Sequence, residues 1–184
     1  MTATAQINAL PLVDPATATG KAADLLKAVK AKLGLVPNMT RAMANAPAAL
    51  DGYLAFSGAL SHGVLTAKQR EQIALLTAEH NTCHYCLSAH TAIGKMVGLD
   101  AAEADAARDA RSSDPKATAL LKFAKAVLAT QGAVQPDQFA AARSAGVTDA
   151  EIAEIVANVA LNVYTNFFNK AAGTEVDFPI VNPR

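Results

Sequence analysis

Apolar residues recur at helical spacing along most of the chain, and proline, glycine and capping residues separate the periodic segments. The first segment follows Asp14-Pro15, a pair typical of an N-cap and a first helical residue, and it ends at Gly34. The pattern predicts an amphipathic helix here, with one face formed by Ala22, Leu25, Leu26, Val29 and Leu33.

Further helices are expected from the same signals. Asn81-Thr82 is a polar pair that is expected to separate two of them, and only the final dozen residues lack periodicity. In chain order the expected helices are a short one in MTRAMANA (39–46), then 47–61, 66–80, 83–98, 100–111, one opened by Asp114-Pro115, 136–145 and 148–172.

Two capping boxes begin similar helices. Thr66 and Gln69 are the first and fourth residues of TAKQREQIALL, and Thr148 and Glu151 are the first and fourth residues of TDAEIAEIVAN. An internal helical duplication is one interpretation, and coincidence between two alanine-rich amphipathic helices is the other.

The length of 184 residues favours a single domain over the whole chain. Residues 1–13 are expected to form an extended N-terminal segment, and residues 174–184 a C-terminal tail. Alanine occupies 43 positions, which favours helix wherever alanine is spread through periodic segments. We therefore expect an all-α fold.

Sixteen basic side chains balance sixteen acidic ones, so the chain lacks the broad positive field that nucleic acid or an anionic membrane would attract. No stretch approaches 18 uninterrupted apolar residues, and the N-terminus has neither the basic start nor the apolar block of a signal peptide. The expected protein is cytoplasmic and binds neither nucleic acid nor a membrane.

The chain has two cysteines, Cys83 and Cys86, at the expected start of a helix. Residues three apart on a helix have Cβ atoms about 5 to 6 Å apart, so these two can form a disulfide with little backbone movement. The unpaired amides and the dipole of a helix start favour a thiolate. A reversible, reactive dithiol is therefore the chemical hypothesis.

His90 lies four residues after Cys86, on the same helical face. An imidazole in that position can accept the thiol proton, and a carboxylate on its other nitrogen would fix the tautomer. Glu71 and Glu79 on the preceding helix are the best carboxylates, and spacing alone does not choose between them.

These residues resemble a known signature. Glu71, eleven intervening residues, Cys83-x-x-Cys86 and three residues to His90 closely resemble the alkylhydroperoxidase D (AhpD)-like signature of the carboxymuconolactone decarboxylase superfamily. The sequences around Pro37-Asn38 and before the last long helix are similar to the peroxidase-related branch. The resemblance covers roughly residues 14–173.

The resemblance implies an all-helical, homo-oligomeric protein, a trimer or hexamer, that reduces hydroperoxides without a metal or other cofactor. It implies that Cys86 attacks the peroxide, that Cys83 resolves the sulfenic acid as a disulfide, and that Glu71 and His90 relay protons. An external dithiol, on a lipoylated or thioredoxin-like protein, would be the reductant. Sulfenic acid formation followed by condensation with a second thiol is established thiol chemistry.

One position departs from the family pattern. Typical members have a second histidine immediately before the second cysteine, where this chain has Tyr85. Tyr85 would keep a hydroxyl near the thiols, while His84 follows Cys83 and points to a different helical face. Tyr85, His84 and Glu79 are secondary candidates.

Other interpretations of the same residues remain open. The two thiols could be inert core residues. A zinc site would use His80, Cys83, Cys86 and His90, but a continuous helix would spread them over roughly 15 Å, and only a break at Asn81-Thr82 would bring them closer.

The alternative functions are a non-catalytic redox sensor or assembly module, and a decarboxylase-like enzyme acting on a lactone. Superfamily members of the lactone type generally lack the cysteine pair, which argues against that alternative. An apolar patch near the end of the last helix is expected to pack in the core or at a subunit interface, and it is formed by Val163, Tyr164, Phe167 and Phe168.

Overall fold

The computed structural model describes residues 10–184. The described part is all-helical, as the periodicity predicts, and the expected N-terminal segment falls largely on residues 1–9, which lie outside the described residues. The elements are α1 (Gly20–Leu33), α2 (Asn38–Met43), α3 (Pro47–Leu60), α4 (Ala67–His80), α5 (His84–Met96), α6 (Ala101–Ala107), α7 (Pro115–Thr130), α8 (Pro136–Ser144) and α9 (Asp149–Ala172).

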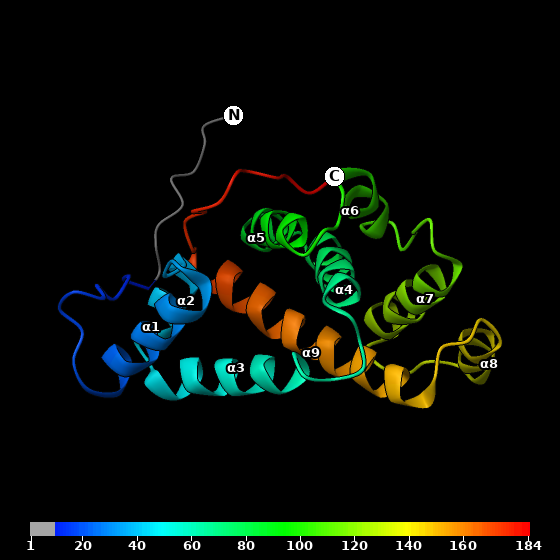
Figure 1. Ribbon diagram of the computed structural model, residues 1–184, viewed down its shortest axis with the longest axis horizontal. Coiled ribbons are helices and arrows are strands. Elements are labelled where there is room, and N and C mark those ends of the chain that lie inside the picture. Colours follow the sequence, from blue (N-terminus) through cyan, green and yellow to red (C-terminus); the bar gives the residue numbers. More distant parts are fainter. Residues whose placement is uncertain (1–9) are drawn as a thin grey trace.

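Helices α4 and α9 form the centre of the molecule (Figure 1). α4 packs against α5, α6, α7 and α9, and residues 72–78 of α4 are buried without interruption. α9 crosses the molecule and contacts α3, α4, α5 and α7. The buried residues of α9 serve packing or a buried site, whereas Val156, Tyr164 and Phe167 of the same helix remain exposed.

Two groups of buried apolar side chains stabilise this arrangement. The larger one joins α4, α5, α7 and α9 and includes Ile73, Leu87, Leu121 and Ile155. The smaller one lies among α1, α2 and α3 and includes Leu26, Met43 and Leu50. The N-terminal helices therefore have a small core of their own.

Local capping chemistry explains several helix starts. Thr66 and Gln69 form the predicted box before α4, and Thr148 and Glu151 form the one before α9. The two boxed helices pack against each other, but α4 ends at His80 whereas α9 continues to Ala172. The capping boxes are confirmed, and the internal duplication stays a prediction.

The predicted helix start at Asp14-Pro15 is wrong, because α1 begins at Gly20. The Asp14 carboxylate accepts the amide N–H of Ala16 at 2.9 Å, and Asp14 C=O accepts that of Thr17 at 3.1 Å, so the pair caps an isolated turn. Gly20 has a φ of +57°, and this left-handed backbone separates the turn from the helix.

The helix that begins after Asp100 is shorter than predicted, since it ends at Ala107 and not near Arg111. Ala110 has a φ of 59°, and Arg111 N–H donates to Ala106 C=O at 3.0 Å. This left-handed closure uses the last helical carbonyls and ends the helix.

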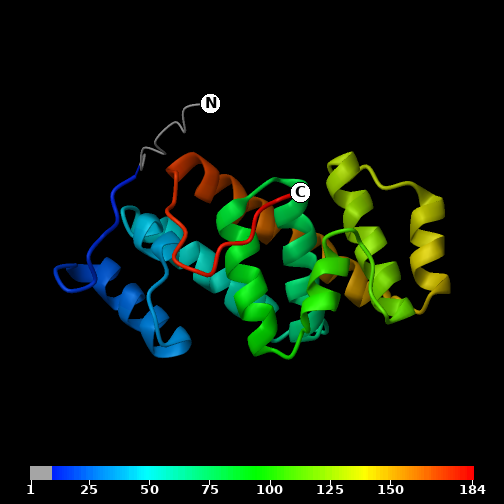
Figure 2. The same cartoon turned by 90° about the horizontal axis from the view of Figure 1, so that it is seen from above.

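The C-terminal residues leave α9 and run across α5 toward α6 (Figure 2). Val181 N–H donates to Ser88 Oγ of α5 at 2.9 Å, and the Arg184 side chain bonds Asp109 at 2.6 Å. The segment 174–184 is therefore anchored on α5 and on the turn that follows α6. None of the helices within residues 10–184 combines the length and apolar character needed to cross a membrane.

Candidate active site

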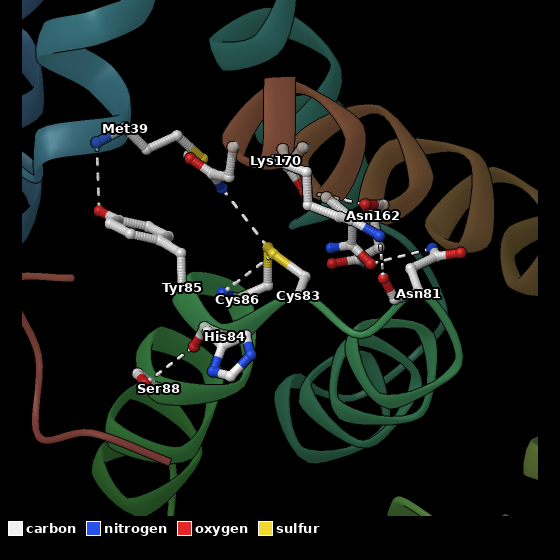
Figure 3. Close-up of a disulfide and its surroundings, with 12 residues drawn as sticks. Met39, Asn81, Cys83, His84, Tyr85, Cys86, Ser88, Asn162 and Lys170 are labelled. Atoms are coloured by element: carbon white, nitrogen blue, oxygen red, sulfur yellow. Dashed lines mark hydrogen bonds between the residues drawn. A yellow bond between two sulfur atoms is a disulfide. The ribbon is translucent and has the colours of Figure 1, made fainter. Parts of the chain in front are cut away.

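Cys83 and Cys86 meet at the start of α5, where α4, α5 and α9 converge (Figure 3). Thr82 has a φ of 49°, and Cys83 N–H donates to Ala78 C=O at 2.9 Å, which ends α4 and creates the predicted break. Cys83 becomes the N-cap of α5, and its sulfur accepts the N–H of Cys86 at 3.3 Å. The CxxC pair therefore occupies the first turn, as predicted.

The two cysteines form a disulfide with Cα atoms 5.3 Å apart. Cys83 is 1% exposed and Cys86 is 2% exposed. The Cys86 sulfur also accepts a hydrogen bond from the side-chain amide of Asn169 on α9, at 3.4 Å. The disulfide is thus buried, and each sulfur receives one N–H donor.

His90 is hydrogen-bonded to Glu71, with 2.8 Å between Nδ1 and Oε2. His90 lies one turn after Cys86 on α5, and Glu71 comes from the first turns of α4. Of the two carboxylates between which spacing did not choose, Glu71 and Glu79, the one that contacts His90 is Glu71. An imidazole held in this way has one fixed tautomer and one ring nitrogen left for proton exchange.

Glu79 lies elsewhere and has other partners. Its Oε2 is 2.7 Å from Arg108 Nη2, and its Oε1 accepts the backbone N–H of Arg184 at 2.8 Å. Glu79 therefore joins α4 to α6 and to the C-terminal segment, away from His90.

The two side chains between the cysteines also point away from the disulfide (Figure 3). Tyr85 Oη accepts the Met39 N–H at 3.2 Å, and its ring packs edge-on against Phe178. Burial is the main cause that raises the pKa of Tyr85 well above its usual range. His84 is exposed, and its Nδ1 is 3.2 Å from Asn182 Oδ1 in the C-terminal segment. Neither contact brings a proton donor to the sulfurs.

A cavity of about 400 Å³ lies beside the disulfide. Cys86, His90 and Glu71 line it, and Cys83 is not among its lining residues. Apolar walls come from α1, α3, α5 and α9 and include Val29, Leu33, Leu54, Ile93 and Leu161. The cavity therefore presents one sulfur and the His–Glu pair to an apolar molecule of small size.

Tyr53 of α3 lines the same cavity. Burial, followed by the negative charge of Glu71, raises the pKa of Tyr53 to about 12. Its hydroxyl therefore keeps its proton at neutral pH and can donate a hydrogen bond to a ligand.

Sequence reasoning missed Tyr53 and Asn169. A signal for Asn169 existed, because α9 carries buried asparagines at intervals of four, four and three residues among apolar ones, namely Asn158, Asn162, Asn166 and Asn169. Such a stripe of amides is costly to bury unless the amides have partners.

The zinc interpretation finds no support in the geometry. His80 is exposed at the end of α4, His90 is bound to Glu71, and both cysteines are in the disulfide. Among residues 10–184, no cluster of three or more histidine, cysteine or acidic side chains is arranged to hold a metal ion.

The fold and this site define an all-helical protein with a vicinal cysteine pair beside a His–Glu pair, and comparison with known proteins agrees. Residues 47–129 match the model of the carboxymuconolactone decarboxylase family. The structure of an uncharacterized peroxidase-related protein from Ralstonia eutropha JMP134, described as an alkylhydroperoxidase AhpD core, is similar with a TM-score of 0.84, 28% identity and 93% coverage of both chains. The chain thus contains a carboxymuconolactone decarboxylase family domain with an AhpD-like fold.

Two further structures share the fold. A peroxidase-related protein from Silicibacter sp. TM1040 has a TM-score of 0.81 and 24% identity, over 95% of this chain and 94% of that one. A cysteine-to-alanine variant of the debrominase Bmp8, in complex with 2,3,4-tribromopyrrole, has a TM-score of 0.71 and 18% identity over 84% of each chain. No curated protein sequence matches the chain.

Proposed function

We propose that the protein is a thiol-dependent peroxidase in which Cys86 reduces hydroperoxides and Cys83 resolves the product. One observation carries the proposal: the Cys86 sulfur, bonded to Cys83, lines the cavity that also holds the hydrogen-bonded His90 and Glu71. The similarity to peroxidase-related proteins supports the same class of reaction.

The proposed cycle balances without a metal or other cofactor. The Cys86 thiolate attacks the terminal oxygen of the hydroperoxide, so that an S–O bond forms while the O–O bond breaks. The leaving alkoxide takes a proton from His90 and departs as an alcohol. Cys83 then attacks the sulfenic sulfur, an S–S bond forms, and the oxygen leaves as water.

The Glu71–His90 pair would act as the proton relay of this cycle. Glu71 holds Nδ1, which leaves Nε2 to take the thiol proton and to return it to the leaving oxygen. Tyr85, His84 and Glu79 take no part in the proposed relay, because their contacts are with Met39, Asn182 and Arg108.

An external dithiol, on a lipoylated or thioredoxin-like protein, would reduce the Cys83–Cys86 disulfide and become oxidised itself. We also propose that the protein forms a homo-oligomer, either a trimer or a hexamer. The side chains that support an interface lie exposed on α9, namely Val156, Tyr164 and Phe167.

Hydroperoxide consumption with dithiothreitol as reductant tests the proposal. We expect the Cys86→Ser protein to consume no tert-butyl hydroperoxide beyond background. Without any reductant, the Cys83→Ser protein should be oxidised once, gain one oxygen in mass and then stall, because it has no resolving thiol. A sulfenic acid trapped by dimedone on Cys83, with Cys86 unmodified, would reverse the two roles.

A redox sensor or assembly module is the second candidate. The burial of both cysteines favours it, because a protein reductant cannot reach the disulfide until neighbouring groups move. One equivalent of disulfide formed per chain, without further peroxide loss in excess dithiothreitol, would support the sensor and contradict the enzyme. The lactone enzyme is disfavoured because its relatives generally lack the cysteine pair.

A further inference from the structure

Asn169 is the buried polar side chain that reaches Cys86 from another helix. It lies in the last turns of α9, is 3% exposed, and lines the cavity. Its Nδ2 donates to the Cys86 sulfur at 3.4 Å across 83 positions of sequence. Within the described residues, it is the side chain that donates a hydrogen bond to this sulfur.

Packing does not explain an asparagine at this position. The Oδ1 atom of Asn169 is buried and has no hydrogen-bond partner among the described residues. Burial of an unpaired acceptor is destabilising, and an apolar side chain of similar size would avoid that cost.

The other asparagines of the stripe have structural partners. Asn158 and Asn162 donate to the backbone carbonyls four residues earlier in α9, at 2.8 Å each. Asn166 accepts the side-chain N–H of Asn81 at 3.0 Å and thereby joins α9 to the turn before Cys83, although its own Nδ2 is also buried without a partner among the described residues. Asn169 differs because its donor is directed at a sulfur.

We infer that Asn169 is a catalytic residue whose amide stabilises negative charge on the Cys86 sulfur. A donated hydrogen bond to a charged acceptor is stronger than one to a neutral acceptor, so the amide favours the thiolate over the thiol. Because the amide N–H cannot itself transfer its proton, its contribution is electrostatic, and proton transfer is left to His90.

This inference rests on the proposed function and extends it to the reduction step. When a reductant thiolate attacks the Cys83 sulfur, a new S–S bond forms, the Cys83–Cys86 bond breaks, and the electron pair goes to Cys86. The departing thiolate then forms 3.4 Å from an N–H donor that is already in place. The amide therefore makes Cys86 the better leaving group, and in the reduced protein it raises the fraction of Cys86 that is present as the thiolate.

The test isolates one thiol in the full-length protein. In a Cys83→Ser background, which keeps a good N-cap for α5, the rate of Cys86 alkylation by iodoacetamide is measured against pH. Asn169→Leu should raise the apparent pKa of the thiol and slow alkylation about tenfold at a pH below that pKa. Asn169→Asp, which keeps the shape but places an acceptor there, should also raise it.

Asn166→Leu in the same background is the matched control, because it removes a buried amide of α9 that does not touch the sulfur. The control should leave the alkylation profile unchanged, and circular dichroism shows whether each variant is folded. If Asn169→Asp is folded and titrates as its parent does, the inference is overturned.

The alkylation assay uses no peroxide, so the two proposals can fail separately. A protein that consumes no hydroperoxide but shows the shift on loss of Asn169 would retain the amide's role and lose the peroxidase. Peroxide turnover with an unchanged thiol titration would retain the peroxidase and rule out the role of Asn169.

Discussion

The hydrogen bond between Glu71 and His90 is the contact on which the proposed proton relay depends. Glu71→Gln keeps the shape of the side chain but removes the charge that stabilises a protonated imidazole. We expect hydroperoxide turnover to fall by roughly 10²-fold or more, the usual range for loss of general acid–base assistance. Steady-state kinetics with dithiothreitol as reductant measures this.

Glu79→Gln is the matched control for that substitution. Glu79 lies two turns later on α4 and binds Arg108, which is 11% exposed. Loss of its charge should lower the melting temperature while turnover per folded molecule stays near that of the parent, because a largely buried arginine loses its partner. If Glu79→Gln removes activity and Glu71→Gln does not, the relay is wrongly assigned.

Gly63 allows the loop between α3 and α4 to approach α9 closely. The Glu154 carboxylate accepts the N–H groups of Val64 and Leu65, at 2.6 and 3.0 Å, and a Cβ at Gly63 would overlap that carboxylate. Gly63→Ala should therefore break both hydrogen bonds and lower the free energy of unfolding by about 1 to 3 kcal/mol. Urea unfolding measures the change.

Gly58→Ala provides the comparison, since a Cβ there meets no atom within 4 Å and the position lies inside α3. Alanine is favoured over glycine in a helix, so this change should stabilise by up to about 1 kcal/mol. Equal changes in the free energy of unfolding at Gly63 and Gly58 would show that the contact with Glu154 does not restrict the side chain at position 63.

The sequence predicted only those residues of the site that lie on a single helix. The spacing of Cys83, Cys86 and His90 is local, so it predicts a shared face of α5 directly. Glu71, Tyr53 and Asn169 come from α4, α3 and α9, and no periodicity says which helices meet. Position on the preceding helix offered Glu71 and Glu79 alike, and only the family resemblance chose Glu71. Neither Tyr53 nor Asn169 was predicted.

Helix positions were mostly predictable, because proline, capping boxes and glycine act over a few residues. The two errors, the helix start at Asp14-Pro15 and the helix end near Arg111, both arise because local signals do not determine the backbone. An Asp-Pro pair satisfies a short turn as well as a helix, and alanine periodicity continues past a left-handed residue such as Ala110. Local signals therefore show where a helix can begin or continue, and the backbone at Gly20 and Ala110 decides where it does.

Arg184 makes several of the polar contacts that hold the C-terminal segment in place. Arg184 bonds Asp105 and Asp109, and its backbone N–H bonds Glu79. Exposed ion pairs contribute little to global stability. We therefore expect Arg184→Ala to change the melting temperature only slightly but to increase hydrogen exchange at the Val181 amide, which bonds Ser88.

Arg111→Ala is the control, because Arg111 also pairs with Asp109, at 3.0 Å, but does not belong to the segment. Exchange at Val181 should stay as in the parent protein. Equal protection in both variants would mean that Phe178 and Val181, and not the arginine, hold the segment in place.

The whole molecule is built around the buried disulfide and the apolar cavity beside it. α4 and α5 contribute the redox and acid–base groups, and α9 contributes the amides. α1 and α3 close the cavity with mainly apolar residues, together with Lys32, Tyr53 and Ser57. The site therefore exists only when both buried cores are formed, and conditions that weaken the N-terminal helices should also open the cavity.

Two tyrosines with raised pKa values, the buried Tyr85 and the partly buried Tyr53, link the stability of the whole fold to alkaline pH. Burial raises the pKa of Tyr53 to about 12 and that of Tyr85 further still, whereas an unfolded tyrosine titrates near 10. Above pH 10 the unfolded chain loses these protons while the folded protein keeps them, so stability falls as pH rises, by about 1.4 kcal/mol per pH unit for each tyrosine. Below pH 10 the contribution is fully present.

In urea unfolding between pH 8 and 11.5, Tyr53→Phe should remove one of the two contributions and make the alkaline decline less steep. Parallel curves for the parent and the variant would contradict the raised pKa of Tyr53.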